Sequence, residues 1–274
     1  MLVRFGHSAD PDDAFMFWAL AEGKIDPRGF RFEWEVEDIA TLNRWARDGR
    51  LEATAISMYT YPYVQERYAL LPQGASMGDG YGPVVVAPRP LSPEQLRGVE
   101  ICVPGTSTTA FLVLRLALGD VRFRELPFDR ILDEVLEGRA EAGLLIHEGQ
   151  LLYEAAGLAK CLDLGEWWLL ETGLPLPLGV MVARRDLGDE LPELAAVLRE
   201  SIRAGLANRS EAMRYALRFG RGIDGEIADR FVSMYVNELT CDFGAEGRQA
   251  VEELLRRADA IGALPGPVRL DFVA

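Results

Sequence analysis

The chain has 274 residues, 49% of them hydrophobic, which is enough for one large core or two smaller ones. Its 43 acidic residues outnumber its 29 basic residues and give a formal net charge of −14, so we expect no nucleic-acid partner. The same acidity disfavours docking on an anionic membrane. Because no apolar run reaches the roughly 18 residues that cross a bilayer, we also expect no membrane insertion.

The N-terminus, the cysteines and the histidines indicate the compartment and the absence of a metal site. Met1 is followed directly by a strand-like segment rather than by a charged and apolar leader, so we expect a cytoplasmic protein. Cys102, Cys161 and Cys241 lie far apart without CxxC spacing. Cys102 and Cys161 stand in apolar strand-like runs and are expected to be small buried hydrophobes. Neither of the two histidines has a metal-ligand partner at helical spacing, so we expect no metal.

Strand-like and helix-like segments alternate along the first two thirds of the chain. Strands are predicted at residues 3–7, 30–36, 53–57, 84–87, 99–104, 121–126, 142–147 and 180–183. Helices are predicted after residue 10, from residue 41, around residues 59–63, at 109–118, 130–138 and 151–156, and over most of the chain from residue 191. This alternation predicts the α/β class with largely parallel sheets.

Two proline-rich stretches interrupt the alternation, at residues 88–93 and 175–179. We interpret them as crossings between two lobes. Residues 1–88 and 178–274 would form a larger, discontinuous lobe, and residues 89–177 a smaller inserted lobe. This layout predicts a two-lobed binding protein with its ligand in the cleft.

A hydroxyl-rich turn, Gly105-Thr106-Ser107-Thr108-Thr109, separates a predicted strand from a predicted helix. The free N–H groups and the positive dipole end of a helix N-terminus suit a carboxylate. Ordinary N-capping would need only one hydroxyl, so we favour an anion site here.

His147 ends the predicted strand at residues 142–147, and ligands of open α/β sheets gather at the carboxyl ends of strands. Imidazole titrates near neutrality, so His147 can be a general base, although a partly exposed turn histidine explains it equally well. His7 and Ser57 also end predicted strands, and together the three indicate one cleft.

Two further groups of side chains have simpler explanations. Asp12 and Asp13 could act as acids or bases. However, Asp10 at the N-cap and Pro11 after it predict the start of a helix, and acidic residues in a first helical turn are explained by that position alone. Several aromatic side chains could line a flat pocket but are more often core: Tyr59, Tyr61, Tyr63, Trp167 and Trp168.

Five segments together resemble the menaquinone-biosynthesis family of the futalosine route. They are residues 37–45, residues 103–105 with 108–110, residues 146–148, residues 172–179 and residues 235–237. Within the family they are similar to the branch that forms 1,4-dihydroxy-6-naphthoate. The other branch, chorismate dehydratase, usually has aromatic residues after Thr-Gly-Leu-Pro and tends to have Gly-Asp at the position of His147.

The resemblance implies a type II periplasmic-binding-protein fold used as a cytoplasmic enzyme. It implies lyase-type cleavage of cyclic dehypoxanthinylfutalosine, a carboxylate-bearing substrate, to 1,4-dihydroxy-6-naphthoate. It also implies that no metal or organic cofactor is needed and that His147 is the base. Residues 55–57 and 109–110 match the substrate-contact segments of the family. The full set of expected substrate-binding residues is Ser8, Asn43, Ala55, Ile56, Ser57, Thr108, Thr109 and Ala110.

The first loop departs from the family pattern, which usually reads Ser-Pro-Cys-Pro-Asn-Asp-Thr-Phe. Here residues 8–15 read Ser-Ala-Asp-Pro-Asp-Asp-Ala-Phe, with added acid. The exact substrate therefore stays open, as does the choice between monomer and homodimer. The alternatives are a non-catalytic solute-binding protein, a chorismate dehydratase and, more distantly, a ligand-sensing regulatory domain.

Overall fold

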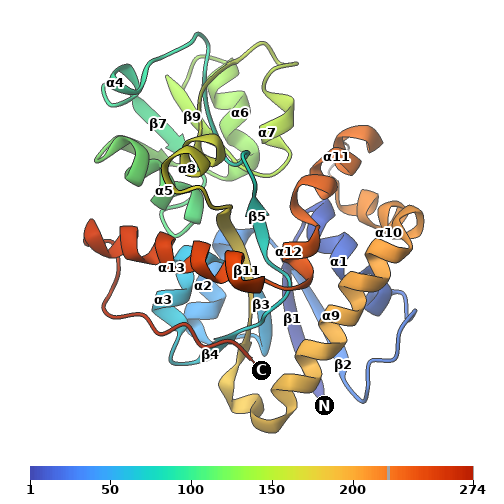
Figure 1. The fold of residues 1–274 in the computed structure, drawn as a ribbon. Helices are drawn as coiled ribbons and strands as arrows, with labels where there is room; N and C mark the ends of the chain where they lie inside the picture. The colour runs from blue at the N-terminus through green and yellow to red at the C-terminus, as the bar shows by residue number, and fades with distance from the viewer. Residues whose placement is uncertain (221–222, 274) are drawn as a thin grey trace.

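Residues 1–220 and 223–273 are described by a computed structural model, in which two β-sheets form the centres of two lobes (Figure 1). The larger sheet has the order β2-β1-β3-β11-β4, with β5 paired to β11. Its strands are β1 (Leu2–Ser8), β2 (Arg31–Glu37), β3 (Ala53–Ser57), β4 (Tyr68–Leu70), β5 (Ser76–Gly78) and β11 (Leu176–Arg184). The smaller sheet has the order β10-β6-β9-β7-β8 and consists of β6 (Val84–Ala87), β7 (Glu100–Val103), β8 (Arg122–Glu125), β9 (Ala142–Leu145) and β10 (Ala159–Asp163).

Helices cover both sheets. Those that follow strands of the smaller sheet are α4 (Pro93–Leu96), α5 (Thr109–Leu118), α6 (Phe128–Leu136), α7 (Gly149–Leu152) and α8 (Leu164–Thr172). The N-terminal part of the larger lobe has α1 (Pro11–Ala21), α2 (Ile39–Asp48), η1 (Met58–Thr60) and α3 (Tyr61–Val64). Its C-terminal part has η2 (Arg185–Glu190), α9 (Leu191–Ala207), α10 (Arg209–Ala216), η3 (Leu217–Phe219), α11 (Gly225–Tyr235), α12 (Glu238–Cys241) and α13 (Gly244–Ala260).

The sheets are mixed, and the prediction of largely parallel sheets is wrong. β1 pairs in parallel with β2 and β3, and β7 pairs in parallel with β8 and β9. In contrast, β11 is antiparallel to β3, and β6 is antiparallel to β9 and β10. The physical reason is that β6 and β11 each enter their sheet from the other lobe, so both begin at the edge where their neighbours end.

The first crossing lies at residues 79–83, before the predicted position. The prediction placed the strand at 84–87 in the larger lobe, but β6 is hydrogen-bonded to β9 and β10 and therefore belongs to the smaller sheet. The proline-rich stretch at 88–93 is a turn inside that lobe, where Pro93 occupies the first position of α4 after the N-cap Ser92. The chain returns at residues 173–175, since Leu176 already pairs with Gly78 of β5.

The core of the larger lobe explains why α1 is apolar on every side. This helix packs on α9, α10 and α11 as well as on β1, and Phe15, Met16 and Phe17 are fully or almost fully buried. A helix buried from all directions has no solvent face to carry charge, so the two carboxylates of its first turn face the interior.

The helix α2 sets the position of Asn43. Its N-cap is Asp38, whose carboxylate accepts a hydrogen bond from the Thr41 N–H at 2.9 Å, so the helix begins two residues before the predicted start. It ends at Gly49, which has a left-handed φ of 71°. Asn43 consequently lies on the buried face of the second turn.

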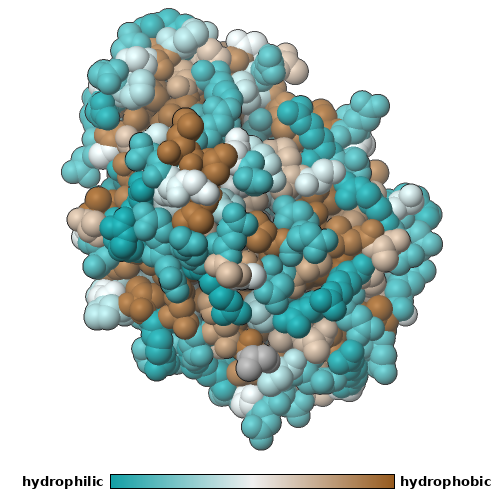
Figure 2. Space-filling view, viewed as in Figure 1, coloured by the Kyte–Doolittle hydropathy of each residue, from teal (hydrophilic) through white to brown (hydrophobic). Residues whose placement is uncertain are grey.

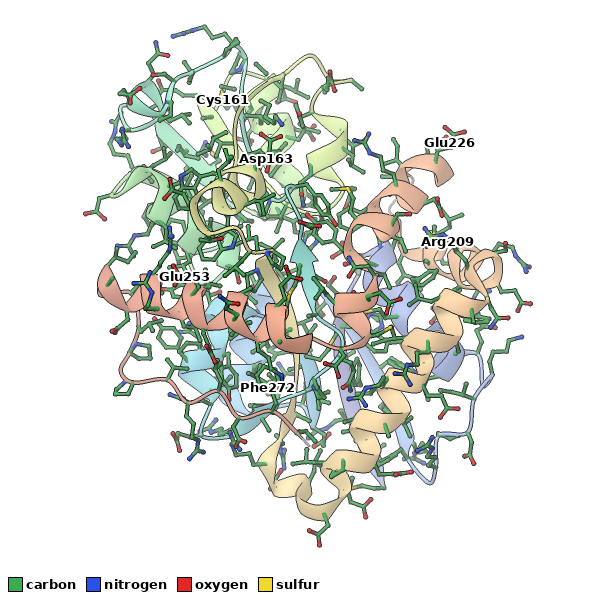
Figure 3. The ribbon with its side chains drawn as sticks, in the orientation of Figure 1. Cys161, Asp163, Arg209, Glu226, Glu253 and Phe272 are labelled. Carbon is green, nitrogen blue, oxygen red and sulfur yellow. The ribbon has the colours of Figure 1, made fainter. Side chains whose placement is uncertain are left out.

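None of the paired tryptophans and neighbouring tyrosines lines the pocket: Tyr59, Tyr61 and Trp168 belong to the core, Trp167 is half-buried and Tyr63 is exposed. Trp168 and Tyr61 are fully buried, and the Trp168 indole donates to the Pro175 carbonyl at 3.1 Å. Arg257 of α13 lies over the Trp168 ring at 5.3 Å. Its guanidinium donates to the carboxylate of Glu253, one turn earlier, at 2.7 Å (Glu253 is labelled in Figure 3). These contacts hold α8 against the larger lobe.

Figure 2 shows a mainly hydrophilic face on which hydrophobic side chains form small separated groups. Among the described residues, no helix combines the length and the apolar character that a membrane span requires.

Candidate active site

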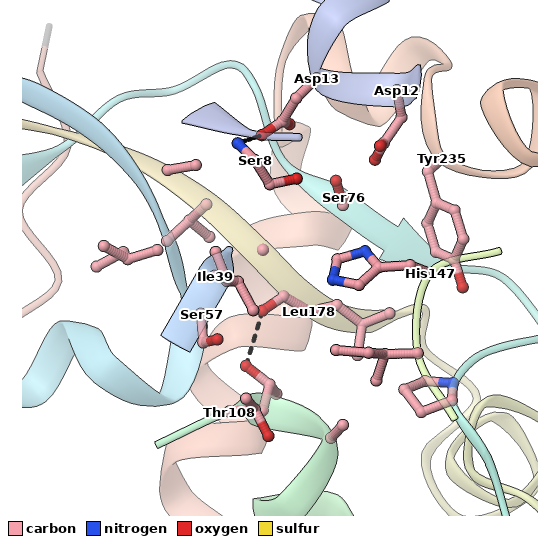
Figure 4. Close-up of a pocket in the computed structure, with 18 of the residues that line it drawn as sticks. Ser8, Asp12, Asp13, Ile39, Ser57, Ser76, Thr108, His147, Leu178 and Tyr235 are labelled. Atoms are coloured by element: carbon pink, nitrogen blue, oxygen red, sulfur yellow. Dashed lines mark hydrogen bonds between the residues drawn. The ribbon is translucent and has the colours of Figure 1, made fainter. Parts of the chain in front are cut away.

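A pocket lies between the lobes, where the carboxyl ends of β1, β3 and β9 meet the N-terminus of α5 (Figure 4). Strand ends gather at such an edge in α/β sheets, so residues distant in sequence converge there. The polar lining consists of Ser8, Asp12, Asp13, Ser57, Ser76, Thr108, Thr109, His147, Gln150 and Tyr235. The apolar lining includes Ile39, Ala55, Ile56, Pro83, Ala110, Ile146, Leu178, Val180 and Phe231. Every residue predicted for the site from the sequence lines this pocket except Asn43 and His7.

His147 reaches the pocket from a strained backbone position just after β9. Its φ of 54° lies in the left-handed region, which non-glycine residues rarely adopt. The ring meets the Phe128 ring edge-on at 4.8 Å, and its Nδ1 lies 2.9 Å from Oδ2 of Asp10. Its Nε2 is buried and has no hydrogen-bond partner in the described part of the chain. One nitrogen is therefore held by a carboxylate while the other faces the pocket.

The protonation of His147 differs from the sequence-based expectation. Burial lowers the pKa of the ring, but the charge and hydrogen bond of Asp10, with smaller contributions from Glu148 and Asp12, raise it overall to about 9. The prediction assumed an ordinary pKa near 6.5 and a largely neutral ring. With Asp10 at Nδ1, the ring is instead mainly an imidazolium at pH 7.

Asp10 does not have the capping role that the sequence predicted. Its backbone has the extended conformation of an N-cap, but the side chain caps no N–H group of α1 in the described structure. The carboxylate instead contacts His147 and accepts a hydrogen bond from the Ser8 hydroxyl.

Asp12 and Asp13 are site residues, although the sequence favoured a helix-start role alone. Both are buried, and burial raises the pKa of Asp12 to about 7 and that of Asp13 well above its ordinary value. Neighbouring carboxylates add to both shifts. Asp13 accepts a hydrogen bond from the Ser8 N–H at 2.6 Å, whereas Oδ1 of Asp12 has no partner within residues 1–220 and 223–273.

At the opposite end of the pocket, the hydroxyl-rich turn meets the larger lobe. The Thr108 hydroxyl is an N-cap that accepts from the Phe111 N–H, and the Thr109 hydroxyl donates to the Leu178 carbonyl at 2.7 Å. Both hydroxyls are thus engaged within the protein, and the excess of hydroxyls serves in part to dock the lobes. The N–H groups of Thr109 and Ala110, in the first turn of α5, have no acceptor within the helix.

Ser57 offers a hydroxyl to this end of the pocket. Asn43, fully buried behind it, donates to the Ser57 hydroxyl at 3.0 Å and accepts from the Ser57 N–H at 2.8 Å. Since the hydroxyl oxygen is already an acceptor, its proton is directed elsewhere and can be donated to a ligand. Asn43 positions Ser57 rather than lining the pocket.

His7 lies away from the pocket, so the prediction that it faces the cleft is wrong. Successive side chains of a strand point to opposite faces, and at the end of β1 Ser8 faces the pocket while His7 faces the core. The His7 ring lies 5.7 to 6.0 Å from the rings of Phe17, Trp34 and Phe219. Burial lowers its pKa to about 4.

Besides Asp12 and Asp13, three further polar lining residues were not predicted as site residues. Tyr235 belongs to a segment that carried the family resemblance, and its hydroxyl donates to Gln150 across the cleft at 2.7 Å. Burial raises its pKa well above the ordinary value, which keeps it a donor. Gln150 and Ser76 lie in short elements without a distinctive sequence pattern.

The pocket is polarised along its length. Figure 4 shows Asp12 and Asp13 at one end, Ser57 and Thr108 at the other, and His147 between them. A ligand carboxylate is favoured at the end with N–H and hydroxyl donors and is repelled from the acidic end. Within the described ranges, no group of three His, Cys, Asp or Glu side chains could hold a metal ion.

The chain is similar to known proteins over nearly its whole length. A family model described as menaquinone biosynthesis matches residues 3–260. A protein of Thermus thermophilus named 1,4-dihydroxy-6-naphthoate synthase is 42% identical over 267 residues, covering 97% of either chain. A protein of the same name from Streptomyces coelicolor is 37% identical and covers 98% of either chain.

Solved structures show the same fold. A protein of Archaeoglobus fulgidus has a TM-score of 0.92 and 46% identity, covering 96% of this chain and 98% of its own. An alkanesulfonate-binding protein of Xanthomonas axonopodis, bound to MOPS, has a TM-score of 0.73 at 12% identity, with 97% and 94% coverage. These likenesses confirm the predicted two-lobed, periplasmic-binding-protein-like α/β fold.

Proposed function

The chain belongs to the menaquinone biosynthesis family, and from this premise we propose that it is a 1,4-dihydroxy-6-naphthoate synthase. The proposed substrate is cyclic dehypoxanthinylfutalosine, and the proposed reaction is a lyase-type carbon–carbon cleavage. The two relatives of that name match 97% and 98% of this chain, so the assignment rests on nearly the whole fold and not on one segment.

One observation favours catalysis over simple binding. The Nε2 of His147 is buried without a partner in the described structure, while its Nδ1 is held by Asp10 at 2.9 Å. Leaving a buried polar atom unpaired costs about 1–3 kcal/mol, so this nitrogen is suited to an interaction with the molecule that fills the pocket. A carboxylate–imidazole pair with a free Nε2 is suited to proton transfer, since the carboxylate orients the ring and stabilises its protonated form.

The substrate carboxylate is proposed to bind at the α5 end of the pocket. The Ser57 hydroxyl and the N–H groups of Thr109 and Ala110 would donate to it. The acidic end would then receive the non-aromatic part of the substrate, where Asp12 can exchange hydrogen bonds with hydroxyl groups. Its raised pKa leaves Asp12 partly protonated at pH 7, so this carboxyl can donate as well as accept.

His147 is proposed as the general base. In its neutral form Nε2 takes a proton from the bound substrate, and Asp10 stabilises the imidazolium that results. We propose that the reaction needs neither a metal nor an organic cofactor, because the described side chains supply acid, base and anion-binding groups. The cytoplasm is the proposed compartment, where three free cysteines would stay reduced.

The decisive experiment is incubation of the purified protein with cyclic dehypoxanthinylfutalosine and, separately, with chorismate. We expect 1,4-dihydroxy-6-naphthoate from the first, detected by liquid chromatography and mass spectrometry, also after treatment with a chelator. Turnover of chorismate would reassign the chain to the dehydratase branch. Tight binding of either compound without turnover would identify a solute-binding protein.

A further inference from the structure

Asp10 and His147 come from different lobes. Asp10 follows β1 of the larger sheet, and His147 follows β9 of the smaller sheet. Their contact, 2.9 Å between Oδ2 and Nδ1, spans the cleft. It therefore depends on how the two lobes are placed relative to each other.

Both partners are fixed by their own lobes. Asp10 is 1% exposed, and the Ser8 hydroxyl donates to the same oxygen that contacts the imidazole. On the other side, the Phe128 ring and the left-handed backbone at His147 restrict the orientation of the imidazole. Neither side chain can follow the other far if the lobes separate.

We propose that Asp10 is the positioning residue of His147 and that closure of the two lobes assembles this pair. The proposal rests on the proton-transfer role of His147 proposed above. In the closed protein, Asp10 directs Nδ1 away from the pocket and Nε2 into it. In the open protein, the imidazole would lose this orientation.

Other contacts close the same cleft and would break with the pair. The Tyr235 hydroxyl of α11 donates to Gln150 of α7 at 2.7 Å, and the Thr60 hydroxyl donates to the Ser107 carbonyl at 3.1 Å. Closure thus joins the lobes at two places besides the contact of Asp10 with His147. A ligand that bridges the lobes would stabilise the same arrangement.

Closure also changes the charge around the imidazole. The carboxyl groups that face His147 are Asp10, Asp12 and Asp13 of the larger lobe, together with its neighbour Glu148. Of these, Asp10 contributes most to the raised pKa of His147. Separation of the lobes would remove that partner, so opening should release a proton and closure should take one up.

The test is an NMR titration that follows the imidazole signals of protein labelled with ¹⁵N-histidine. The chain has only two histidines, so only two imidazoles contribute signals. The wild type and Asp10→Asn are compared, each alone and with saturating 1,4-dihydroxy-6-naphthoate. We expect a high His147 midpoint in the wild type with naphthoate and a midpoint lower by at least about one pH unit in Asp10→Asn, since loss of an adjacent opposite charge shifts a pKa by about 1–3 units. His7→Phe in both backgrounds assigns the remaining resonance.

Kinetics supplies the second readout. Asp10→Asn should lower kcat between about 10- and 10,000-fold, the range for loss of a group that orients a catalytic side chain, with KM nearly unchanged. The pH dependence of kcat/KM should move with the NMR midpoint. Asp129→Asn, which removes an exposed carboxylate of α6, is the control and should resemble the wild type.

Equal His147 midpoints in wild type and Asp10→Asn, both with and without naphthoate, would overturn the proposal. So would equal losses of binding and turnover without a change in the pH profile, which would indicate a structural role. Asp10→Cys introduces the residue usual in the family and serves if the Asn variant does not fold. The titration requires no turnover, so it distinguishes failure of this inference from failure of the proposed reaction.

Discussion

Asn43 and Ser57 exchange two hydrogen bonds, one from the Asn43 amide to the Ser57 hydroxyl at 3.0 Å and one from the Ser57 N–H to the Asn43 carbonyl oxygen at 2.8 Å. The pair joins the middle of α2 to the last residue of β3. Because the Ser57 hydroxyl oxygen accepts from the Asn43 amide, its own proton points away from Asn43 and can be donated into the pocket. The ligand-facing serine is thus oriented by a residue that does not itself line the pocket.

Ser57→Ala and Asn43→Ala should therefore differ in effect. Loss of a hydrogen bond to a charged ligand costs about 1.5–3 kcal/mol, so Ser57→Ala should raise KM about 10- to 100-fold with little change in kcat. Asn43→Ala leaves the buried Ser57 N–H unpaired and should also lower the free energy of unfolding by about 1–3 kcal/mol. Steady-state kinetics and urea unfolding measure the two effects.

The exposed Ser210 of α10 provides the control, since Ser210→Ala should change the free energy of unfolding by less than about 0.5 kcal/mol. If Ser57→Ala lowered kcat and left KM unchanged, the carboxylate would not bind at this end of the pocket.

A second prediction concerns His147 itself. His147→Asn should lower kcat by at least about 100-fold, the smaller contribution of a positioned acid–base group, while naphthoate still binds. His7→Phe keeps a ring among the same aromatic neighbours and should retain activity. Near wild-type turnover by a well-folded His147→Asn protein would remove His147 from the mechanism.

The sequence predicted most strands and helices because each follows from local patterns. The strand at 84–87 was found correctly but assigned to the wrong lobe. A strand buried on both faces reads the same in either sheet, and the prolines that follow it suggest a boundary as readily as a turn. Only the hydrogen bonds of β6 to β9 and β10 decide its sheet, and such pairing is not encoded locally.

The site was predicted in part. The alternation of a strand decides that Ser8 faces the pocket and His7 the core, but the phase of that alternation depends on which face of β1 is covered. Likewise, Asp12 and Asp13 look like ordinary first-turn acids unless α1 is known to be buried on all sides. The contact of Asp10 with His147 could not be predicted, because it depends on how the lobes are packed.

A third prediction concerns the first crossing. A Cβ at Gly165, near the start of α8, would lie 2.0 Å from the Tyr81 backbone of the crossing. Gly165→Ala should therefore force the segments apart and lower the free energy of unfolding by about 1–3 kcal/mol, measured by urea unfolding. Gly225→Ala is the control, because its Cβ would meet its nearest neighbour at 3.9 Å. Equal stability of the two variants would contradict the close packing of crossing and helix.

A fourth prediction follows from the buried His7. Its pKa is lowered to about 4 in the folded protein, so its neutral form favours folding above about pH 6.5, and this stabilisation is lost as the pH falls towards 4. At pH 5 the loss is about 2 kcal/mol. His7→Phe should lose less stability between pH 7 and pH 5 than the wild type, in urea unfolding at both values. The carboxylates are the same in both proteins, so their contribution cancels in this comparison. An equal change in the free energy of unfolding between pH 7 and pH 5 in both proteins would show that His7 does not cause the loss.

The last prediction is the pH dependence of turnover. Burial lowers the pKa of His147, but the greater combined effect of Asp10 and the nearby carboxylates raises it to about 9, so at pH 7 only a small fraction is neutral. If His147 is the base, kcat/KM should rise about tenfold per pH unit below this pKa and level off above it. Titration of Asp12, with its pKa raised to about 7, should add a weaker inflection in the same profile.

The opposite sign has a definite meaning. A general acid at His147 would be active while protonated, so kcat/KM would be flat below about pH 9 and fall above it. Asp12→Asn separates the two inflections, because it should remove the one near pH 7 and leave the limb governed by His147. The profile of kcat/KM is measured between pH 6 and pH 10, with the stability of the protein checked at each end. A fall of kcat/KM above about pH 9 would identify His147 as a general acid instead of a base. Loss of the pH dependence in His147→Asn would assign the titration to this residue.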